Sequence, residues 1–286
     1  MKKYVLITGV STGIGYDAAR ELIANDCHVL GSVRRRADGE RVQREFGEAF
    51  TPLYFDVTDA AAIAAAVPQV EAVTGTGGLA GLVNNAGIAP VGPLMHIPPE
   101  EFQRLMDTNV TGLLRVTQAF LPLLGARRGA TQTPGRIVNI SSISGGMTFP
   151  LVAAYSASKF AVEALSDGLR RELSIYGIHV ALIEPGSIQT PIWDKAVSNL
   201  SERRYAQTDY ATQMASMIEF SAGESRNGKP VGIVSAAIRD AILSPRPKLR
   251  YPLVVTWHLR KLIPMRLLDK MLCKNMGLKP LKRCPD

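Results

Sequence analysis

The chain has 286 residues, of which 46% are hydrophobic and 20% charged, and a formal net charge of +8 at pH 7. This composition is typical of a globular protein with one sizeable core, and it excludes a disordered chain or a multi-pass membrane protein. No apolar run approaches the roughly eighteen residues that span a bilayer. The short apolar run after Lys3 ends in a glycine-rich loop, so we interpret it as a buried strand and not as a signal peptide.

The positive charge is confined to the C-terminal end. Residues 245–286 contain eleven Lys and Arg against two acids, which leaves 22 basic and 23 acidic groups in the first 244 residues. A balanced body with a basic tail is not the pattern of a nucleic-acid groove, so we expect no nucleic-acid partner. Cys27, Cys273 and Cys284 are too few and too scattered for a disulfide framework or a metal site, which favours a metal-free protein of the reducing cytoplasm.

Short β-branched runs alternate with longer helical segments along the chain. Strands are predicted at Tyr4–Thr8, His28–Ser32, Pro52–Asp56, Ala80–Asn84, Arg136–Ser141, Val180–Glu184 and Tyr251–Val255. Helices are predicted near 13–25, 38–46, 59–72, 99–124, 154–175 and 229–243. Continuous apolar strands separated by helices indicate an α/β fold, a Rossmann-like doubly wound parallel sheet with its ligand crevice at the carboxyl ends of the strands.

Two regions depart from this alternation. Residues 187–228 form an insertion with a helical stretch near 201–221 but no strand, and residues 256–286 form a basic extension after the last strand. No linker divides the chain, so we expect one dinucleotide-binding and catalytic domain over residues 1–255, in which 187–228 is a helical substrate loop.

The C-terminal extension is predicted to contain an amphipathic helix between Pro264 and Gly277. Its apolar face comprises Leu267, Leu268, Met271 and Leu272, and its basic face Arg266, Lys270 and Lys274. A helix of this kind can make peripheral contact with an anionic membrane. It can equally pack on the body of the protein or on a second subunit.

A glycine-rich turn, TGVSTGIG at residues 8–15, follows the first strand and opens a helix. Gly9 permits a tight turn, Gly13 permits the backbone to approach a pyrophosphate, and Gly15 permits close packing of helix on strand. The helix N-terminus supplies N–H donors for phosphate. The spacing is G-x-x-x-G-x-G and not the commoner G-x-G-x-x-G, and by itself the turn is also compatible with a purely steric role.

Further motifs follow in a fixed order: NNAG at 84–87, Asn109, a serine pair at 141–142, YSASK at 155–159, Pro185-Gly186 and Thr190. From about Lys3 to Thr190 this order resembles the short-chain dehydrogenase/reductase family in its single-domain form. The resemblance implies an oxidoreductase acting on CH–OH groups with a nicotinamide cofactor. It also implies a homodimer or homotetramer.

The catalytic chemistry is expected at Tyr155 and Lys159, which lie four residues apart on a predicted helix and so share a face. A nearby ammonium favours the phenolate and lowers the pKa of tyrosine. The resemblance implies that Tyr155 exchanges a proton with the substrate oxygen and that Lys159 also holds the nicotinamide ribose. It further implies that Ser142 hydrogen-bonds the same oxygen and that Asn109 orders a water joining Lys159 to solvent.

The resemblance also implies a set of cofactor-binding residues. They are Gly9, Ser11, Thr12, Gly13, Ile14, Gly15, Arg34, Asp56, Val57, Asn84, Ala86, Gly87, Tyr155, Lys159, Pro185, Gly186, Ile188 and Thr190. Asp56 matches the acid that meets the adenine amino group. An alternative role for Asp56 is to cap the next helix, for which Asp59 is better placed.

The residues after the second strand bear on the choice between NAD and NADP. Val33 stands where NAD-preferring relatives carry Asp, and Arg34 stands where NADP-preferring relatives carry an arginine that binds the 2′-phosphate. We therefore expect NADP(H) to be preferred. Thr12, in place of the extra basic residue of some NADP-preferring relatives, argues the other way, and NAD stays open. The run Arg34–Arg36 is also compatible with a solvated surface.

The substrate side is expected to be apolar and rich in methionine. Its candidate residues are Ile143, Met147, Phe149, Trp193, Met214 and Met217. Such a wall suits a lipophilic alcohol or carbonyl compound, although methionines at helical spacing also occur as plain core. The tail after the last strand resembles the ends of bacterial relatives of hydroxysteroid and retinol dehydrogenases, which favours a steroid- or retinoid-like substrate.

Two alternative functions stay open. One is reduction of a small carbonyl metabolite or a ketoacyl thioester, against which the apolar wall argues. The other is a regulatory protein that binds the cofactor and senses redox state. A sensor has no need of a proton relay, so the complete set Asn109, Ser142, Tyr155 and Lys159 favours an enzyme.

Overall fold

The computed structural model describes residues 2–192, 204–254 and 262–280. Its centre is one parallel sheet of seven strands in the order β3-β2-β1-β4-β5-β6-β7. The strands are β1 Lys3–Thr8, β2 Cys27–Val33, β3 Phe50–Tyr54, β4 Gly81–Asn84, β5 Arg136–Ile140, β6 His179–Glu184 and β7 Arg250–Pro252. The predicted doubly wound α/β fold is confirmed, with each predicted strand at or within two residues of its expected start.

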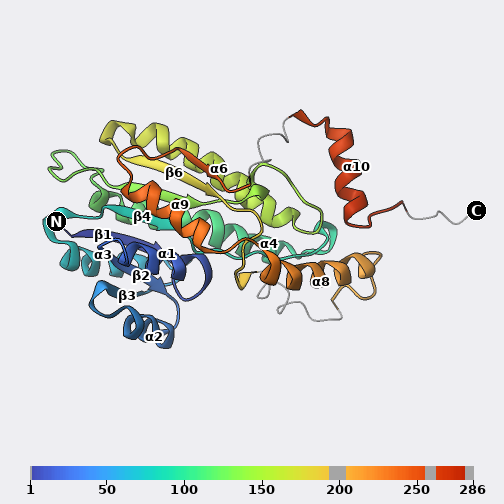
Figure 1. Ribbon diagram of the computed structural model, residues 1–286, viewed down its shortest axis with the longest axis horizontal. Helices are drawn as coiled ribbons and strands as arrows, with labels where there is room; N and C mark the ends of the chain where they lie inside the picture. Colours follow the sequence, from blue (N-terminus) through green and yellow to red (C-terminus); the bar gives the residue numbers. More distant parts are fainter. Residues whose placement is uncertain (1, 193–203, 255–261, 281–286) are drawn as a thin grey trace, which may run out of the picture.

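Both faces of the sheet are covered, as the continuous apolar strands predict. The helices of the central domain are α1 Gly13–Ile23, α2 Arg36–Phe46, α3 Ala60–Thr74, α4 Pro99–Met106, α5 Gly112–Phe120, α6 Ala153–Glu172 and α9 Gly232–Leu243. Val5 and Ile7 pack with residues of α1, α2 and α9 in one core cluster. Leu6, between them in sequence, packs with α3, α5 and α6 on the opposite face (Figure 1).

The predicted helix over 99–124 is not continuous. A π-helical turn, Asp107–Thr111, separates α4 from α5, and a 3₁₀ turn follows at Leu121–Leu124. The apolar periodicity continues through the interruption, which is why the sequence pattern does not reveal it. Single π turns inside helices occur frequently at functional sites, and this one contains Asn109.

The insertion at 187–228, predicted to be a substrate loop, contains α8, Ala211–Asn227, which begins ten residues later than predicted. Residues 204–210 instead make turns, in which the N–H of Thr208 donates to the carbonyl of Tyr205. The extension contains α10, Met265–Asn275, which begins directly after Pro264 and ends before Gly277, whose φ is +65°. No residue of α10 is buried, and the helix stands apart from the sheet at one end of the molecule (Figure 1).

Candidate active site

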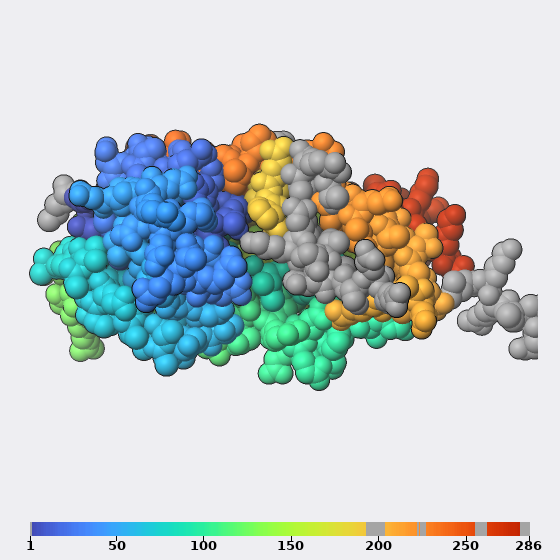
Figure 2. Space-filling model, turned by 90° about the horizontal axis from the view of Figure 1, so that it is seen from below, coloured from blue at the N-terminus to red at the C-terminus, as the bar shows by residue number. Residues whose placement is uncertain are grey.

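A cavity of about 850 Å³ follows the carboxyl edge of the sheet. It begins at the glycine turn between β1 and α1, where the strand order reverses, and it extends to residue 192 and Arg204 of the substrate loop. Figure 2 views the molecule from below, with the N-terminal segment in blue beside the segment near residue 185 in yellow. All the predicted cofactor-binding residues line this cavity except Gly15 and Asn84.

The glycine turn has a backbone conformation that strongly favours glycine. Gly9 and Gly13 have φ values of +72° and +64°, a region that residues with a Cβ seldom adopt. A Cβ on Gly15 would lie 2.4 Å from the carbonyl oxygen of Gly9. Gly15 therefore acts by permitting the first turn of α1 to pack against the loop, as its predicted role requires. The residues present fit a dinucleotide whose pyrophosphate lies at this helix N-terminus.

Asn85, and not Asn84, supports the turn. The side-chain amide of Asn85 donates to the carbonyl oxygens of Thr8 and Gly9, at 2.9 and 3.0 Å. The amide of Asn84 is buried and donates to Thr117 and Asn139, at 3.0 and 2.9 Å. The structure thus assigns Asn84 to the interior between β4, β5 and α5, because the side chains of adjacent residues leave a strand on opposite sides.

Arg34 and Asp56, which are expected near the adenosine of the cofactor, line the cavity just after β2 and β3. Arg34 follows β2 and lies on the cavity wall with its Nη1 3.8 Å from Oδ2 of Asp56. Asp56 also accepts hydrogen bonds from the N–H and hydroxyl of Thr58, at 2.9 and 2.8 Å. Asp59 is the residue that caps α3, accepting from the N–H of Ala62 at 2.9 Å. The carboxylate of Asp56 therefore stays at the cavity and is not used as a helix cap.

Tyr155 and Lys159 face the cavity from the first turns of α6. The Nζ of Lys159 donates to the carbonyl oxygen of Ile140 at 2.8 Å and lies 5.6 Å from the centre of the Tyr155 ring. Burial lowers the pKa of Lys159 to about 8, an effect that the negative charge of Glu163 opposes. The lysine is thus fixed at the end of β5, next to the tyrosine.

The pKa of Tyr155 moves opposite to the sequence-based expectation. Burial raises it to about 12, although a side-chain hydrogen bond with Ser142 lowers it. The physical reason is that the phenol of Tyr155 is buried away from water, while the ammonium of Lys159 donates to the carbonyl oxygen of Ile140. In this state the phenol is protonated at neutral pH, which suits it to donate a proton.

Ser142 and Asn109 complete the predicted set. Ser142 lines the cavity at the end of β5, and its hydroxyl also accepts from the N–H of Ser144 at 3.1 Å. Asn109 is buried behind the cavity and bonds both the N–H and the carbonyl of Ile88, each at 2.9 Å. Its amide also donates to Ser158 at 3.0 Å. Asn109 therefore joins the π turn to α6 and to the chain after β4.

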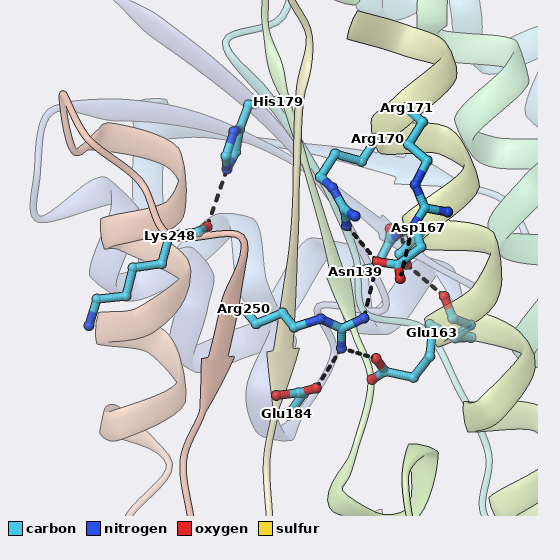
Figure 3. Close-up of polar contacts among 11 residues, drawn as sticks. Asn139, Glu163, Asp167, Arg170, Arg171, His179, Glu184, Lys248 and Arg250 are labelled. Atoms are coloured by element: carbon cyan, nitrogen blue, oxygen red, sulfur yellow. Dashed lines mark hydrogen bonds and ion pairs between the residues drawn. The ribbon is translucent and has the colours of Figure 1, made fainter. Parts of the chain in front are cut away.

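A partly buried charge cluster, which the sequence motifs did not indicate, joins α6, β6 and β7 (Figure 3). Arg250 of β7 donates to Glu184 at 2.8 Å, to Asp167 at 3.0 Å, and to Glu163. Glu184 immediately precedes Pro185-Gly186 on the cavity wall, and Glu163 follows Lys159 by one turn. The cluster thus ties the helix of the Tyr-Lys pair to the strand end that borders the cavity.

None of the predicted apolar substrate residues within the described ranges lines this cavity. Met214 and Met217 are 3% and 4% exposed and pack with Val91, Leu151 and Tyr205. Ile143, Met147 and Phe149 do not line the cavity, and Trp193 lies outside the described residues. The methionines of α8 are therefore core, the alternative that their helical spacing left open.

The cavity wall toward the substrate loop is mixed in character. Its apolar part comprises Ile88, Ala89, Pro90, Val91 and Ile192, and its charged part Glu101, Arg104, Asp107 and Arg204. The sequence pattern did not single out these charged residues. For Glu101, Arg104 and Asp107 a signal was available in their three-residue spacing on the predicted helix over 99–124, which places them near one another on its surface.

A phosphate-binding turn at one end of a cavity and a Tyr-Lys pair at the other define the class of dinucleotide-dependent oxidoreductases. The part of the chain that the structure describes contains no cluster of three potential metal ligands and no helix long and apolar enough to cross a membrane.

Comparison with known proteins identifies the family. Residues 3–201 match the model of the short chain dehydrogenase family. An NADPH-dependent 3-dehydrocapnine reductase of Ornithobacterium rhinotracheale is 40% identical over 278 residues, covering 96% of this chain and 97% of the relative. Human retinol dehydrogenase 16 is 33% identical over 263 residues, covering 87% and 80%. A short-chain dehydrogenase structure from Streptomyces avermitilis superposes with a TM-score of 0.73 at 28% identity, covering 98% and 99%.

The chain therefore belongs to the short-chain dehydrogenase family and is an NAD(P)-dependent oxidoreductase.

Proposed function

We propose that the protein is an NADP(H)-dependent reductase that interconverts an alcohol with a ketone or aldehyde on a lipophilic substrate, with Tyr155 as the acid and base. The observation that carries this proposal is the placing of Tyr155, Ser142 and Lys159 on the wall of the cavity that begins at the glycine turn. When bound, reduced nicotinamide supplies the hydride for such a reaction.

The side chains of the protein supply the proton and steady the charge. Tyr155, kept protonated by burial, donates its proton to the carbonyl oxygen of the substrate during reduction. Ser142 hydrogen-bonds the same oxygen as negative charge develops on it. The ammonium of Lys159 then stabilises the phenolate that Tyr155 becomes once it has donated its proton. In the direction of oxidation, the phenolate takes the proton back.

NADP(H) is proposed as the preferred cofactor because Arg34 lines the cavity beside Asp56 and Val33 supplies no carboxylate. The guanidinium has no bidentate carboxylate partner within the described residues, which leaves it able to receive a 2′-phosphate. The NADPH dependence of the Ornithobacterium relative supports this choice. In the wild type, NADPH should bind more tightly than NADH, and Arg34→Asp should reverse the order. Equal or tighter NADH binding by the wild type would contradict the preference.

A lipophilic substrate is proposed from the apolar part of the wall and from the retinol dehydrogenase relatives. The test is NADPH consumption, followed by the absorbance of reduced nicotinamide, with retinal, a steroid ketone, a medium-chain ketone and acetone as substrates. We expect turnover on the larger compounds. Turnover confined to acetone would favour a reductase of small carbonyl metabolites.

Tyr155→Phe tests the proton relay, with Tyr176→Phe as the matched control outside the cavity. General acid catalysis contributes roughly 10²–10⁴-fold, so Tyr155→Phe should lower kcat by at least about 100-fold while the Kd for NADPH is kept. Tyr176→Phe should behave as wild type. Tight NADPH binding without turnover on any compound would instead favour the redox sensor.

A further inference from the structure

One part of the cavity wall carries charges that a purely apolar substrate would leave unused. Glu101 and Arg104 lie on α4, and Arg204 lies just before α8 in the substrate loop. Burying polar and charged groups against a hydrocarbon is unfavourable unless they are paired. The side chains of Glu101 and Arg204 are largely buried, whereas Arg104 is exposed to solvent. A ligand that covers this wall removes these charges from water, so a polar or charged group on the ligand is favoured here.

Arg204 is fixed in place by its neighbours. Its Nη2 lies 2.7 Å from Oε2 of Glu101, and its guanidinium lies 5.1 Å from the centre of the Tyr205 ring. The side chains of Arg204 and Glu101 are 25% and 19% exposed, so the pair is largely removed from water. Glu101 engages one nitrogen of a group with five N–H donors, which leaves donors for a ligand.

Arg104 adds a positive charge that the wall does not neutralise. It lies one turn after Glu101 on α4, and its guanidinium has no ion pair or hydrogen bond with any other residue in the described ranges. The remaining acid of this wall, Asp107, is already paired with Arg115 at 2.7 Å. With Arg204 paired to Glu101 and Asp107 paired to Arg115, the charged wall has one uncompensated positive charge among the described residues, that of Arg104.

Arginine is the side chain best suited to bind the oxygens of an anionic group, because its planar fork can donate two parallel hydrogen bonds. The same cavity contains the Tyr-Lys pair and the apolar stretch from Ile88 to Val91. A ligand that uses all three parts has a carbonyl for Tyr155, a hydrocarbon portion for the apolar wall and an anion for the arginines.

We propose that Arg104 and Arg204 form an anion subsite and that the substrate is an amphipathic ketone or aldehyde with an ionised sulfonate, phosphate or carboxylate headgroup. This inference rests on the proposed reductase function and narrows its substrate class. Glu101 acts as a positioning residue, since it holds the guanidinium of Arg204 at the cavity wall.

The test compares two substrates that differ only in the headgroup, 2-oxodecane-1-sulfonate and 2-decanone. The wild type should reduce the sulfonate with a higher kcat/KM. A hydrogen-bonded charge contributes enough for roughly a 10- to 100-fold effect, so Arg104→Met and Arg204→Met should each lower kcat/KM on the sulfonate by that factor. Turnover of 2-decanone and the Kd for NADPH should stay within about twofold.

Arg239→Met is the matched control, because Arg239 forms an ion pair with Glu21 and neither residue lines the cavity. It should leave the ratio of the two kcat/KM values unchanged. Arg104→Met breaks no ion pair of the described residues, so it keeps the test informative if Arg204→Met fails to fold.

Calorimetric binding of decane-1-sulfonate, which cannot be reduced, provides a readout separate from turnover. Binding by the wild type and loss of binding in both arginine variants are expected. Failure of the wild type to bind it, or equal loss of activity on both substrates in the variants, overturns the subsite. Weaker NADPH binding in the arginine variants also overturns it, since the arginines would then serve the cofactor. Reduction of 2-decanone without any preference for the sulfonate refutes the subsite alone, whereas reduction of neither contradicts the reductase function itself.

Discussion

Replacing Arg250 by methionine should destabilise the protein far more than replacing another arginine of similar exposure. Methionine keeps most of the apolar stem but removes the donors to Glu163, Asp167 and Glu184. The side chains of Glu184 and Glu163 are only 6% and 14% exposed, so water cannot readily replace the guanidinium. The variant therefore leaves carboxylates buried without their counter-charge.

The expected magnitude follows from these burials. Removing one partner of a buried ion pair costs about 3–5 kcal/mol. The side chain of Arg250 is itself 36% exposed, so solvent enters more easily than in a fully buried pair. We therefore expect a loss of about 2–4 kcal/mol in the free energy of unfolding. At roughly 2–4 °C per kcal/mol for a chain of this size, Tm should fall by about 4–16 °C.

The control is Arg239→Met. Arg239 donates to Glu21 at 2.6 Å, but the two side chains are 41% and 30% exposed. Exposed pairs contribute at most about 1 kcal/mol, so its Tm should change little. Urea unfolding at pH 7, with calorimetric melting as a second measurement, compares the two variants. Equal losses in both would refute the reasoning that burial of the carboxylates makes the Arg250 cluster important.

Three further outcomes are expected. Gly15→Ala should weaken NADPH binding at least about tenfold in a titration with NADPH, because the added Cβ would lie 2.4 Å from a backbone oxygen. Gly168→Ala has open space around the added Cβ, so it should stabilise α6 by up to about 1 kcal/mol in urea unfolding. The kcat/KM for reduction should fall above about pH 8 as Lys159 loses its proton, while Tyr155 stays protonated; a pH profile that is flat to pH 10 would argue against this assignment. The exposed apolar and basic side chains of α10 should bind vesicles that contain anionic lipid at low salt but not at high salt. A chain that ends before residue 262 should not bind. Flotation of the full chain at every salt concentration would exclude an electrostatic contact.

The amino-acid sequence by itself determined the order of strands and helices, the parallel sheet and the two motifs at the ends of the cavity. These features depend on local patterns, namely the period of apolar residues, the conformational freedom of Gly9 and Gly13, and the four-residue spacing from Tyr155 to Lys159. The ends of α10 at Pro264 and Gly277 were likewise predictable, because proline and glycine act within one turn of a helix.

Only the tertiary structure decided which side chains share an environment. Arg250 meets Glu163, 87 residues earlier in the chain, and Arg204 meets Glu101 across the cavity wall. Residue spacing predicted that Lys159 lowers the pKa of Tyr155, and it could not show that burial raises this pKa. It also could not show that Met214 packs in a core. Burial and long-range charge contacts are properties of the packed molecule, since they depend on what surrounds each group in space and not on its neighbours in the sequence.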